Sequence, residues 1–356
     1  MRLLKSYRVQ EVKSIVKKKL KSKSKKKRKG YWKNYHLSMG NDKQDFDLLL
    51  EVCREQGNPW NNGKRGPKPK MEPWEYASIQ CFRRLKGNTY RGTEKISELL
   101  TGKFIDHSWV GKTFKKISPL YFKVVINAFY GRIKEIFSKQ PSAYISDGTY
   151  IGTDRYNYNE DETDRKIVLV TWHIIVEYWY RVGLICIRWC DSPNPLTEPT
   201  RESPVYKKMM KEGNITGQGQ LFPKDKGYDD KKIRELDKKH GFVPIIPFRE
   251  HEKLKQEKKN ELTLTEKIQY RFTRGIVEGI FGGTTTEHDN KTRMRLPITR
   301  QNDTILLGLK QNLQTFKRAI ILILLKLATT PNHTTHLNNK TYLSCLKNRD
   351  QTVLEY

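Results

Sequence analysis

Three acidic residues, far apart in the 356-residue chain, occur where a carboxylate could take part in chemistry. Asp147 lies in a run of β-branched and aromatic residues that predicts a strand, where a charge is disfavoured unless it is paired or binds a cation. Asp225 follows the short apolar run 221–223, and Glu278 lies in a segment with helical periodicity. Each also has a structural explanation: an edge strand for Asp147, a turn or helix N-cap for Asp225, and an ion pair with Arg274 for Glu278.

The segment around Glu278 can be examined on a helical wheel. At 100° per residue its apolar side chains form one stripe, which consists of Ile268, Phe272, Ile276 and Ile280. Arg271, Arg274 and Glu278 fall on the opposite side, within about 60° of one another. A helix that packs through the stripe would therefore present two arginines and one carboxylate together.

Three carboxylates from distant segments can hold two divalent cations. Hard cations such as Mg²⁺ bind carboxylate oxygens, whereas His and Cys suit softer metals. Two such ions can flank a scissile phosphate, one activating the attacking oxygen and the other stabilising the leaving oxygen. We therefore predict Asp147, Asp225 and Glu278 as catalytic residues and as ligands of two Mg²⁺ ions, with Mn²⁺ as a possible substitute.

Other acidic residues compete for these roles. Asp229 and Asp230 lie close to Asp225, but both suit the first turn of the following helix better. The acidic cluster within 159–164 is more typical of a solvated hairpin tip than of a metal site.

The elements that must position the acids form a mixed α/β pattern from residue 142 onward. Strands are predicted at 143–151, 167–177, 181–190, 220–223 and 242–247, and helices at 202–212, 229–239, 265–281 and 303–327. Three consecutive strands followed by alternating helices and strands indicate one mixed sheet. The ribonuclease-H-like fold has this order, with acids on its first strand, after its fourth strand and on a later helix.

The preceding segment, residues 66–140, has a helical pattern. Helices are predicted at 73–87, 93–100 and 119–137, with another beginning near Ser108 as its N-cap. The helix that begins near Ser108 carries Lys112, Lys115 and Lys116. This arrangement fits a helix-turn-helix DNA-binding domain. A plain helical bundle with a solvated basic face fits equally well.

The charge of the chain points to a polyanionic partner. Its 69 Lys and Arg outnumber its 39 Asp and Glu, for a formal net charge of +30, and residues 1–40 contain 15 of those bases and one acid. Such an arm is expected to be disordered alone and to bind nucleic acid, although a solubilising tail has the same composition. No apolar run predicts a membrane span or a secretory signal. Five cysteines without a C-x-x-C pair favour reduced thiols, so we expect a cytoplasmic, nucleoid-associated protein.

At the acids the sequence resembles the insertion-sequence DDE transposases of the insertion sequence 4 and 5 superfamily. The matching pieces are 144–149 (YISDGT), 224–229 (KDKGYD), 274–281 (RGIVEGIF) and the basic run 293–296 (RMRL). The resemblance covers about residues 66–320. It implies Asp147, Asp225 and Glu278 as the metal-binding triad, with Arg274 and Tyr228 contacting DNA or orienting the acids.

The third piece departs from the family signature Tyr-x2-Arg-x3-Glu-x6-Lys. Arg271 stands at the tyrosine position, with Tyr270 one residue early, and Thr285 stands at the lysine position. Phosphate contact on this side is therefore assigned to Arg271, Arg293 or Arg295.

The sequence thus predicts a DNA transposase with four parts: a basic, largely disordered arm and linker (1–65), a helical DNA-binding domain (66–140), a ribonuclease-H-like catalytic domain (141–330) and a tail (331–356). It would bind the element ends as double-stranded DNA, cleave phosphodiester bonds and join 3′-OH ends to target DNA, assembling as a homodimer on DNA. Two alternatives remain open: a ribonuclease-H-like nuclease or resolvase without strand transfer, and a non-enzymatic basic DNA-binding protein such as an inactive transposase remnant.

Overall fold

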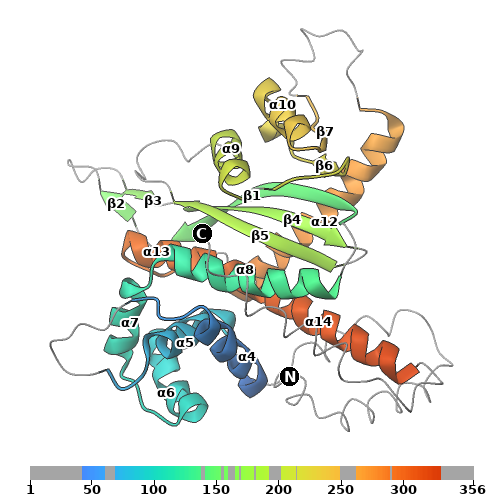
Figure 1. Cartoon of the computed structure of the whole chain (residues 1–356). Coiled ribbons are helices and arrows are strands. Elements are labelled where there is room, and N and C mark those ends of the chain that lie inside the picture. The colour runs from blue at the N-terminus through green and yellow to red at the C-terminus, as the bar shows by residue number, and fades with distance from the viewer. Residues whose placement is uncertain are drawn as a thin grey trace. The chain divides into compact units, whose positions relative to one another are not determined.

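The structure is a computed structural model that describes residues 42–60, 69–137, 141–153, 156–158, 165–167, 170–179, 182–191, 202–213, 215–248, 262–288 and 291–329 (Figure 1). The chain forms two compact units. One is Asp45–Phe316, and the other combines Met1–Gln44 with Lys317–Tyr356. The predicted basic arm, residues 1–40, and the tail, 331–356, lie outside the described residues. The contacts discussed below lie within the first unit.

A mixed sheet forms the centre of this unit. Its main strands are β1 (Ala143–Thr153), β4 (Val170–Trp179), β5 (Val182–Asp191), β6 (Leu221–Pro223) and β7 (Val243–Ile245). They lie in the order β5-β4-β1-β6-β7, with β8 (Lys291–Thr292) also pairing with β1. β1, β4 and β5 are antiparallel neighbours, whereas β6 runs parallel to β1 and β7 parallel to β6. The expected mixed α/β sheet with flanking helices is therefore present.

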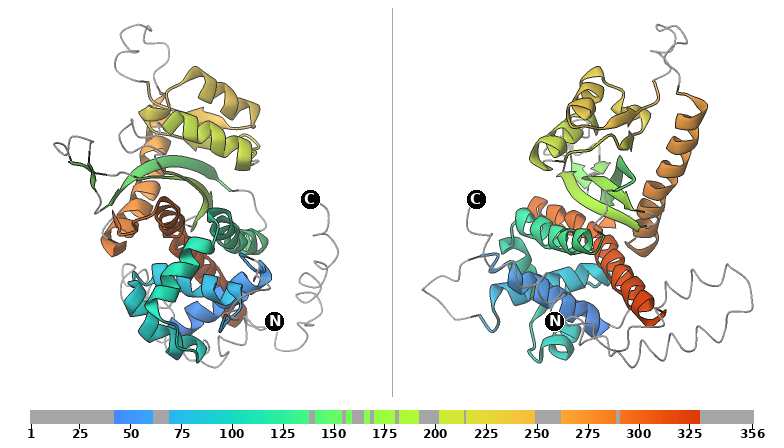
Figure 2. Two further views of the ribbon diagram at one scale, coloured as in Figure 1. Left: turned by 90° about the vertical axis from the view of Figure 1, so that its left-hand side faces the viewer. Right: turned by 45° about the vertical axis from the view of Figure 1, so that its right-hand side comes forward.

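Helices cover both faces of the sheet (Figures 1 and 2). On one face lie α9 (Glu202–Gly213) and α10 (Lys231–Lys239), over a core of aromatic and aliphatic side chains that includes Tyr144, Ile175 and Phe222. On the other face lie α8 (Pro119–Ile136), α12 (Leu264–His288) and α13 (Pro297–Ile305). There, buried Trp172 of β4 meets Phe281 of α12 edge to face, with ring centroids 5.5 Å apart. Trp172 is thus a packing residue.

The helical region before the sheet consists of α4 (Asp42–Glu55), α5 (Pro73–Leu85), α6 (Tyr90–Thr101), α7 (His107–Lys116) and the already named α8. The α5–α7 trio packs together, as the sequence predicts. It is also tied to the C-terminal elements, because the Asn302 side chain donates to the carbonyl oxygens of Phe114 and Ile117 at 3.1 and 2.9 Å. The proposed boundary between helical and catalytic domains stays a prediction.

Three sequence predictions about this region are wrong. The range 1–65, predicted as a largely disordered arm and linker, contains α4, whose Phe46 and Val52 are fully buried. The single helix predicted at 303–327 is two helices, α13 and α14 (Leu307–Thr329), which meet at Leu306. The N-cap of α7 is Asp106 rather than Ser108, because its carboxylate accepts from the Ser108 backbone N–H at 2.8 Å.

Two further expectations can be compared with the fold. A short antiparallel pair, β2 (Tyr156–Tyr158) and β3 (Arg165–Ile167), flanks the acidic cluster, which itself lies outside the described residues. Cys53 and Cys81 are buried free thiols, as predicted. Among the described helices, none combines the length and apolar character needed to cross a membrane.

Candidate active site

Asp147 lies in a part of β1 where, among the described residues, only one side pairs with a strand. Pairing with the β6 side ends at the bridge between Ser146 and Lys224, and β8 pairs only from Gly152. Asp147 is opposite Ile174 of β4, which places its half-buried carboxylate on the α12 face of the sheet. β1 as a whole lies between β4 and β6, but at Asp147 it is locally an edge, so this part of the structural explanation holds.

Asp225 and Glu278 are joined by one guanidinium group. Arg274 donates from Nη1 to Asp225 Oδ1 at 3.0 Å and from Nε to Glu278 Oε1 at 2.7 Å. Asp225 lies two residues after the end of β6, and Glu278 lies one turn after Arg274 on α12. Their side chains are 32% and 59% exposed, so both carboxylates can be reached from solvent. The structural explanations for these acids also hold, since Asp225 caps the following turn and Glu278 forms the i,i+4 ion pair.

Tyr270 reaches the same point despite its shifted place in the signature. Its hydroxyl donates to Asp225 Oδ1 at 3.3 Å and accepts from Arg274 Nη1 at 3.0 Å. Because Tyr270 and Arg274 are one helical turn apart, both project toward Asp225. Arg271, the residue at the signature position, is exposed.

The three acids share one electrostatic environment around Asp147. Burial, the largest cause, raises the pKa of Asp147 to about 6, and the negative charges of Asp225 and Glu278 act in the same direction. The N–H of Gly148, 2.8 Å from Oδ1, and the Arg274 guanidinium oppose this rise in pKa. A cation placed among the acids would therefore restore the ionised form of Asp147.

The donor set can be tested against the predicted metal ions. Carboxylate oxygens are hard ligands, and Arg274 already places a positive charge between two of them. Among the described residues, only Glu94, Asp106 and His107 bring three ligand atoms within 4.8 Å of one another. Asp147, Asp225 and Glu278 are thus too widely spaced in this structure for one ion shared by all three, and the two-ion site stays a prediction.

Behind Asp225 lies a buried ionic network that sequence reasoning missed. Lys224, 1% exposed, donates to Asp237 Oδ2 at 2.5 Å, and the Tyr206 hydroxyl donates to Asp237 Oδ1 at 2.5 Å. The Lys224 ammonium also lies 3.4 Å from the centroid of the Phe222 ring. Burial lowers the pKa of Lys224 to about 8, although Asp237 opposes the shift. The network anchors the end of β6 to α10 and so fixes the position of the Asp225 backbone.

Tyr228 and the competing aspartates have structural roles. Tyr228 is 1% exposed within the core under α9 and α10, so the prediction that it contacts DNA is wrong. Asp229 pairs with Arg234 at 2.7 Å, and Asp230 caps α10 by accepting from the Lys232 N–H at 2.8 Å. Both aspartates serve the start of α10, as the sequence predicts.

The packing face of α12 differs from the predicted stripe. Its buried residues are Thr273, Val277 and Ile280, whereas Ile268 is 61% exposed. The side chain of Phe272 lies outside the described residues. The buried face of α12 is rotated relative to the predicted stripe, because α12 packs along the part of β1 that has no described neighbouring strand. This rotation brings Arg274 toward the sheet. α12 also continues to His288 through Gly282 and Gly283.

The other predicted DNA-binding residues gather at a second place. Lys112, Lys115, Arg293 and Arg295 all line one cavity of about 750 Å³. Lys116 lies apart from this lining, with its ammonium 5.7 Å from the centroid of the Trp109 ring. Segments that are distant in sequence thus join into one basic surface.

Comparisons with known proteins give similarities to solved structures alone. No known family model matches the chain, and no curated protein matches it. A cryo-EM structure of a piggyBac transposase synaptic complex with hairpin DNA is similar, with a TM-score of 0.41 and 9% sequence identity, over 89% of this chain and 84% of that chain. A similarity this low carries no argument about function.

Proposed function

We propose that the chain is a DDE-type DNA transposase. The observation that carries this proposal is the convergence of Asp147, Asp225 and Glu278 around Arg274 and the uncovered side of β1. These acids come from a first strand, from the end of a later strand and from a still later helix.

The sheet supports the same proposal. Its first three long strands form an antiparallel meander, and β6 and β7 then add in parallel on the far side of β1. This is the strand order of a ribonuclease-H-like domain, with the β2–β3 pair inserted between the first and second strands. In such a domain the three acids would occupy the places that the sequence predicts for metal ligands.

The residues of the site would divide the work of phosphodiester chemistry. When bound by the three carboxylates, two Mg²⁺ ions would supply activation of the attacking oxygen and neutralisation of the leaving oxygen. Asp147 would be the shared ligand, with Asp225 and Glu278 each completing one ion. Arg274, 43% exposed, bridges the two outer carboxylates and can turn toward a phosphate.

Two successive reactions follow from this arrangement. Attack by water on phosphorus breaks the bond to the 3′ oxygen and leaves a free 3′-OH end. That hydroxyl then attacks a phosphodiester bond in target DNA, forming one new bond to phosphorus and releasing one target 3′ oxygen. Because paired ends must be joined, the assembly on DNA would be at least a homodimer.

The decisive experiment replaces Asp147 with Asn in the full chain. Mg²⁺-dependent cleavage of DNA that carries the element ends should fall by about 100-fold or more, the scale expected for losing a group that stabilises the transition state. DNA binding measured by fluorescence anisotropy should be retained. Glu235→Gln, which removes a carboxylate from an exposed ion pair with Lys231, is the matched control and should cleave normally.

Unchanged cleavage by Asp147→Asn would contradict the proposed site. Joining of a cleaved 3′ end into a target plasmid separates a transposase from a nuclease or resolvase. DNA binding by the wild-type chain with no cleavage in Mg²⁺ or Mn²⁺ would identify a non-enzymatic DNA-binding protein.

A further inference from the structure

A cleft separate from the three acids lies between α7 and the segment Arg293–Leu296. One wall is a single face of α7, formed by His107, Ser108, Gly111, Lys112 and Lys115. The opposite wall is the segment that follows β8. The cavity of about 750 Å³ includes none of the proposed metal ligands in its lining. It is therefore a different surface from the candidate active site.

The lining of the cleft is strongly basic. Six cationic side chains contribute to it: Arg83, Arg84, Lys112, Lys115, Arg293 and Arg295. Its carboxylate, Asp303, is 1% exposed and is paired with Arg83 at 2.9 Å and with Arg84 at 3.5 Å. The positive charge that faces the cavity is thus largely uncompensated by acids of the lining.

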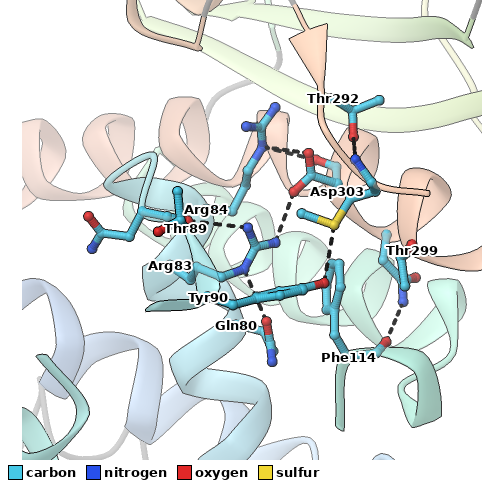
Figure 3. A network of polar contacts seen from close by, with 12 residues as sticks. Gln80, Arg83, Arg84, Thr89, Tyr90, Phe114, Thr292, Thr299 and Asp303 are labelled. Carbon is cyan, nitrogen blue, oxygen red and sulfur yellow. Dashed lines mark hydrogen bonds and ion pairs between the residues drawn. The ribbon is translucent and has the colours of Figure 1, made fainter. Parts of the chain in front are cut away.

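Arg84 holds an unused hydrogen-bond donor at the base of the cleft (Figure 3). Its side chain is 9% exposed, and its Nε donates to the carbonyl oxygen of Asp303 at 3.2 Å. Its Nη2 is buried and has no hydrogen-bond partner. A buried donor without a partner is costly, so an anionic ligand that reached it would recover that cost.

The base of the cleft is held rigidly before any ligand binds. The Arg83 guanidinium lies against two neighbouring rings, 5.2 Å from the Tyr90 centroid and 4.8 Å from the Phe114 centroid. The Tyr90 hydroxyl contacts Met294 Sδ at 3.1 Å and so links α6 to the opposite wall. Figure 3 shows this network between the two walls. Fixed cationic groups lose little entropy on binding, which favours affinity.

We propose that this cleft binds the phosphate backbone of DNA as a docking site distinct from the catalytic acids. The inference rests on the proposed function, since it names a second contact of the same substrate. Six cations from three chain segments exceed what one phosphate needs, but they match successive phosphates along a strand. A volume of this size accommodates a short stretch of backbone at the edge of a duplex.

The test measures binding of a fluorescent 30-base-pair duplex by the full chain, with salt varied. Two variants remove charges from opposite walls: Lys112→Gln with Lys115→Gln, and Arg293→Gln with Arg295→Gln. Each should weaken binding about 10- to 60-fold at 0.1 M salt and lower the slope of log K against log salt by about 1.8, because each phosphate contact contributes about 0.9. Lys238→Gln with Lys239→Gln, two exposed lysines on α10, is the matched control.

The result that overturns the inference is a loss of affinity in both cleft variants no larger than in the control. Binding of inorganic phosphate that both cleft variants abolish, with duplex affinity unchanged, would also overturn it, since the cleft would then hold a small anion alone. Thermal unfolding of each variant verifies that a loss of binding is not a loss of folding.

The two proposals can fail separately. Binding of the cleft variants is measured again in the Asp147→Asn chain, so cleavage does not affect the assay. If Asp147→Asn cleaves DNA normally while the cleft variants lose affinity, the triad is refuted and the docking site stands. If Asp147→Asn abolishes cleavage while the cleft variants bind normally, the docking site is refuted and the triad stands.

Discussion

Two sets of arginine–aspartate pairs link distant segments of this protein, and they differ mainly in burial. At the candidate active site, Arg274 and Asp225 are 43% and 32% exposed. At the base of the cleft, Arg83 and Asp303 are 3% and 2% exposed at a similar distance of 2.9 Å. An exposed pair contributes little to stability and can exchange partners, whereas a buried pair is costly to break. The same chemistry thus provides an adjustable contact at one place and a fixed support at the other.

The largest effect is expected from Asp303→Asn. This change leaves Arg83 and Arg84 buried without a countercharge and should lower the free energy of unfolding by about 3–5 kcal/mol. Although burial raises the pKa of Asp303, the two arginines outweigh it and hold that pKa below the ordinary value, which shows that the charged form is favoured here. Urea titration at pH 7 measures the effect. A loss below about 1 kcal/mol would show that the two pairs do not differ as proposed.

An intermediate effect of opposite sign is expected from Asp147→Asn. The folded-state pKa of about 6 exceeds the ordinary value of 3.8, so ionising Asp147 reduces stability as pH rises from about 4 to about 6. Without divalent cations, the variant should therefore be more stable than wild type by about 1–3 kcal/mol at pH 7, and equal to it at pH 3.5. Urea titrations of both proteins at pH 7 and pH 3.5 test this. Equal stability at pH 7 would contradict the raised pKa of Asp147 in the folded protein.

The smallest effect is expected from Arg274→Gln. Because this arginine is 43% exposed, its loss should change the free energy of unfolding by less than about 1 kcal/mol, despite its contacts with Asp225 and Glu278. Thermal unfolding beside Asp303→Asn gives a direct comparison. A loss as large as that of Asp303→Asn would mean that the site depends on Arg274 as a structural support.

The sequence predicts the sheet well because its strands have strong local signals. The runs around Ile145, Ile174 and Ile187 are rich in β-branched residues, and all three form strands in the predicted succession. The three acids could be named because they interrupt or end such elements. The start of α13, six residues before the predicted helix, had a usable signal in Pro297, which suits a first helical turn.

Other features depend on contacts that no local pattern reveals. Lys224 looks like a surface lysine in sequence, and only the approach of Asp237 shows that it is buried. Arg83 and Asp303 pair although they are 220 residues apart in sequence, so the local sequence around either residue does not indicate its partner. The packing face of α12 is likewise chosen by β1 rather than by its own apolar residues, which is why Ile268 is exposed.

The side chains of Lys224 and Asp225 point to opposite faces of the sheet, and this has a consequence for folding. β6 is only three residues long and has few hydrogen bonds with which to select its alignment on β1. A slip by one residue would turn the aspartate into the aromatic core under α9 and α10 and the lysine toward the acids. Both misplacements would cost far more than the lost backbone bonds. Two adjacent charges of opposite sign thus help to select the alignment of the short strand that precedes a candidate catalytic residue.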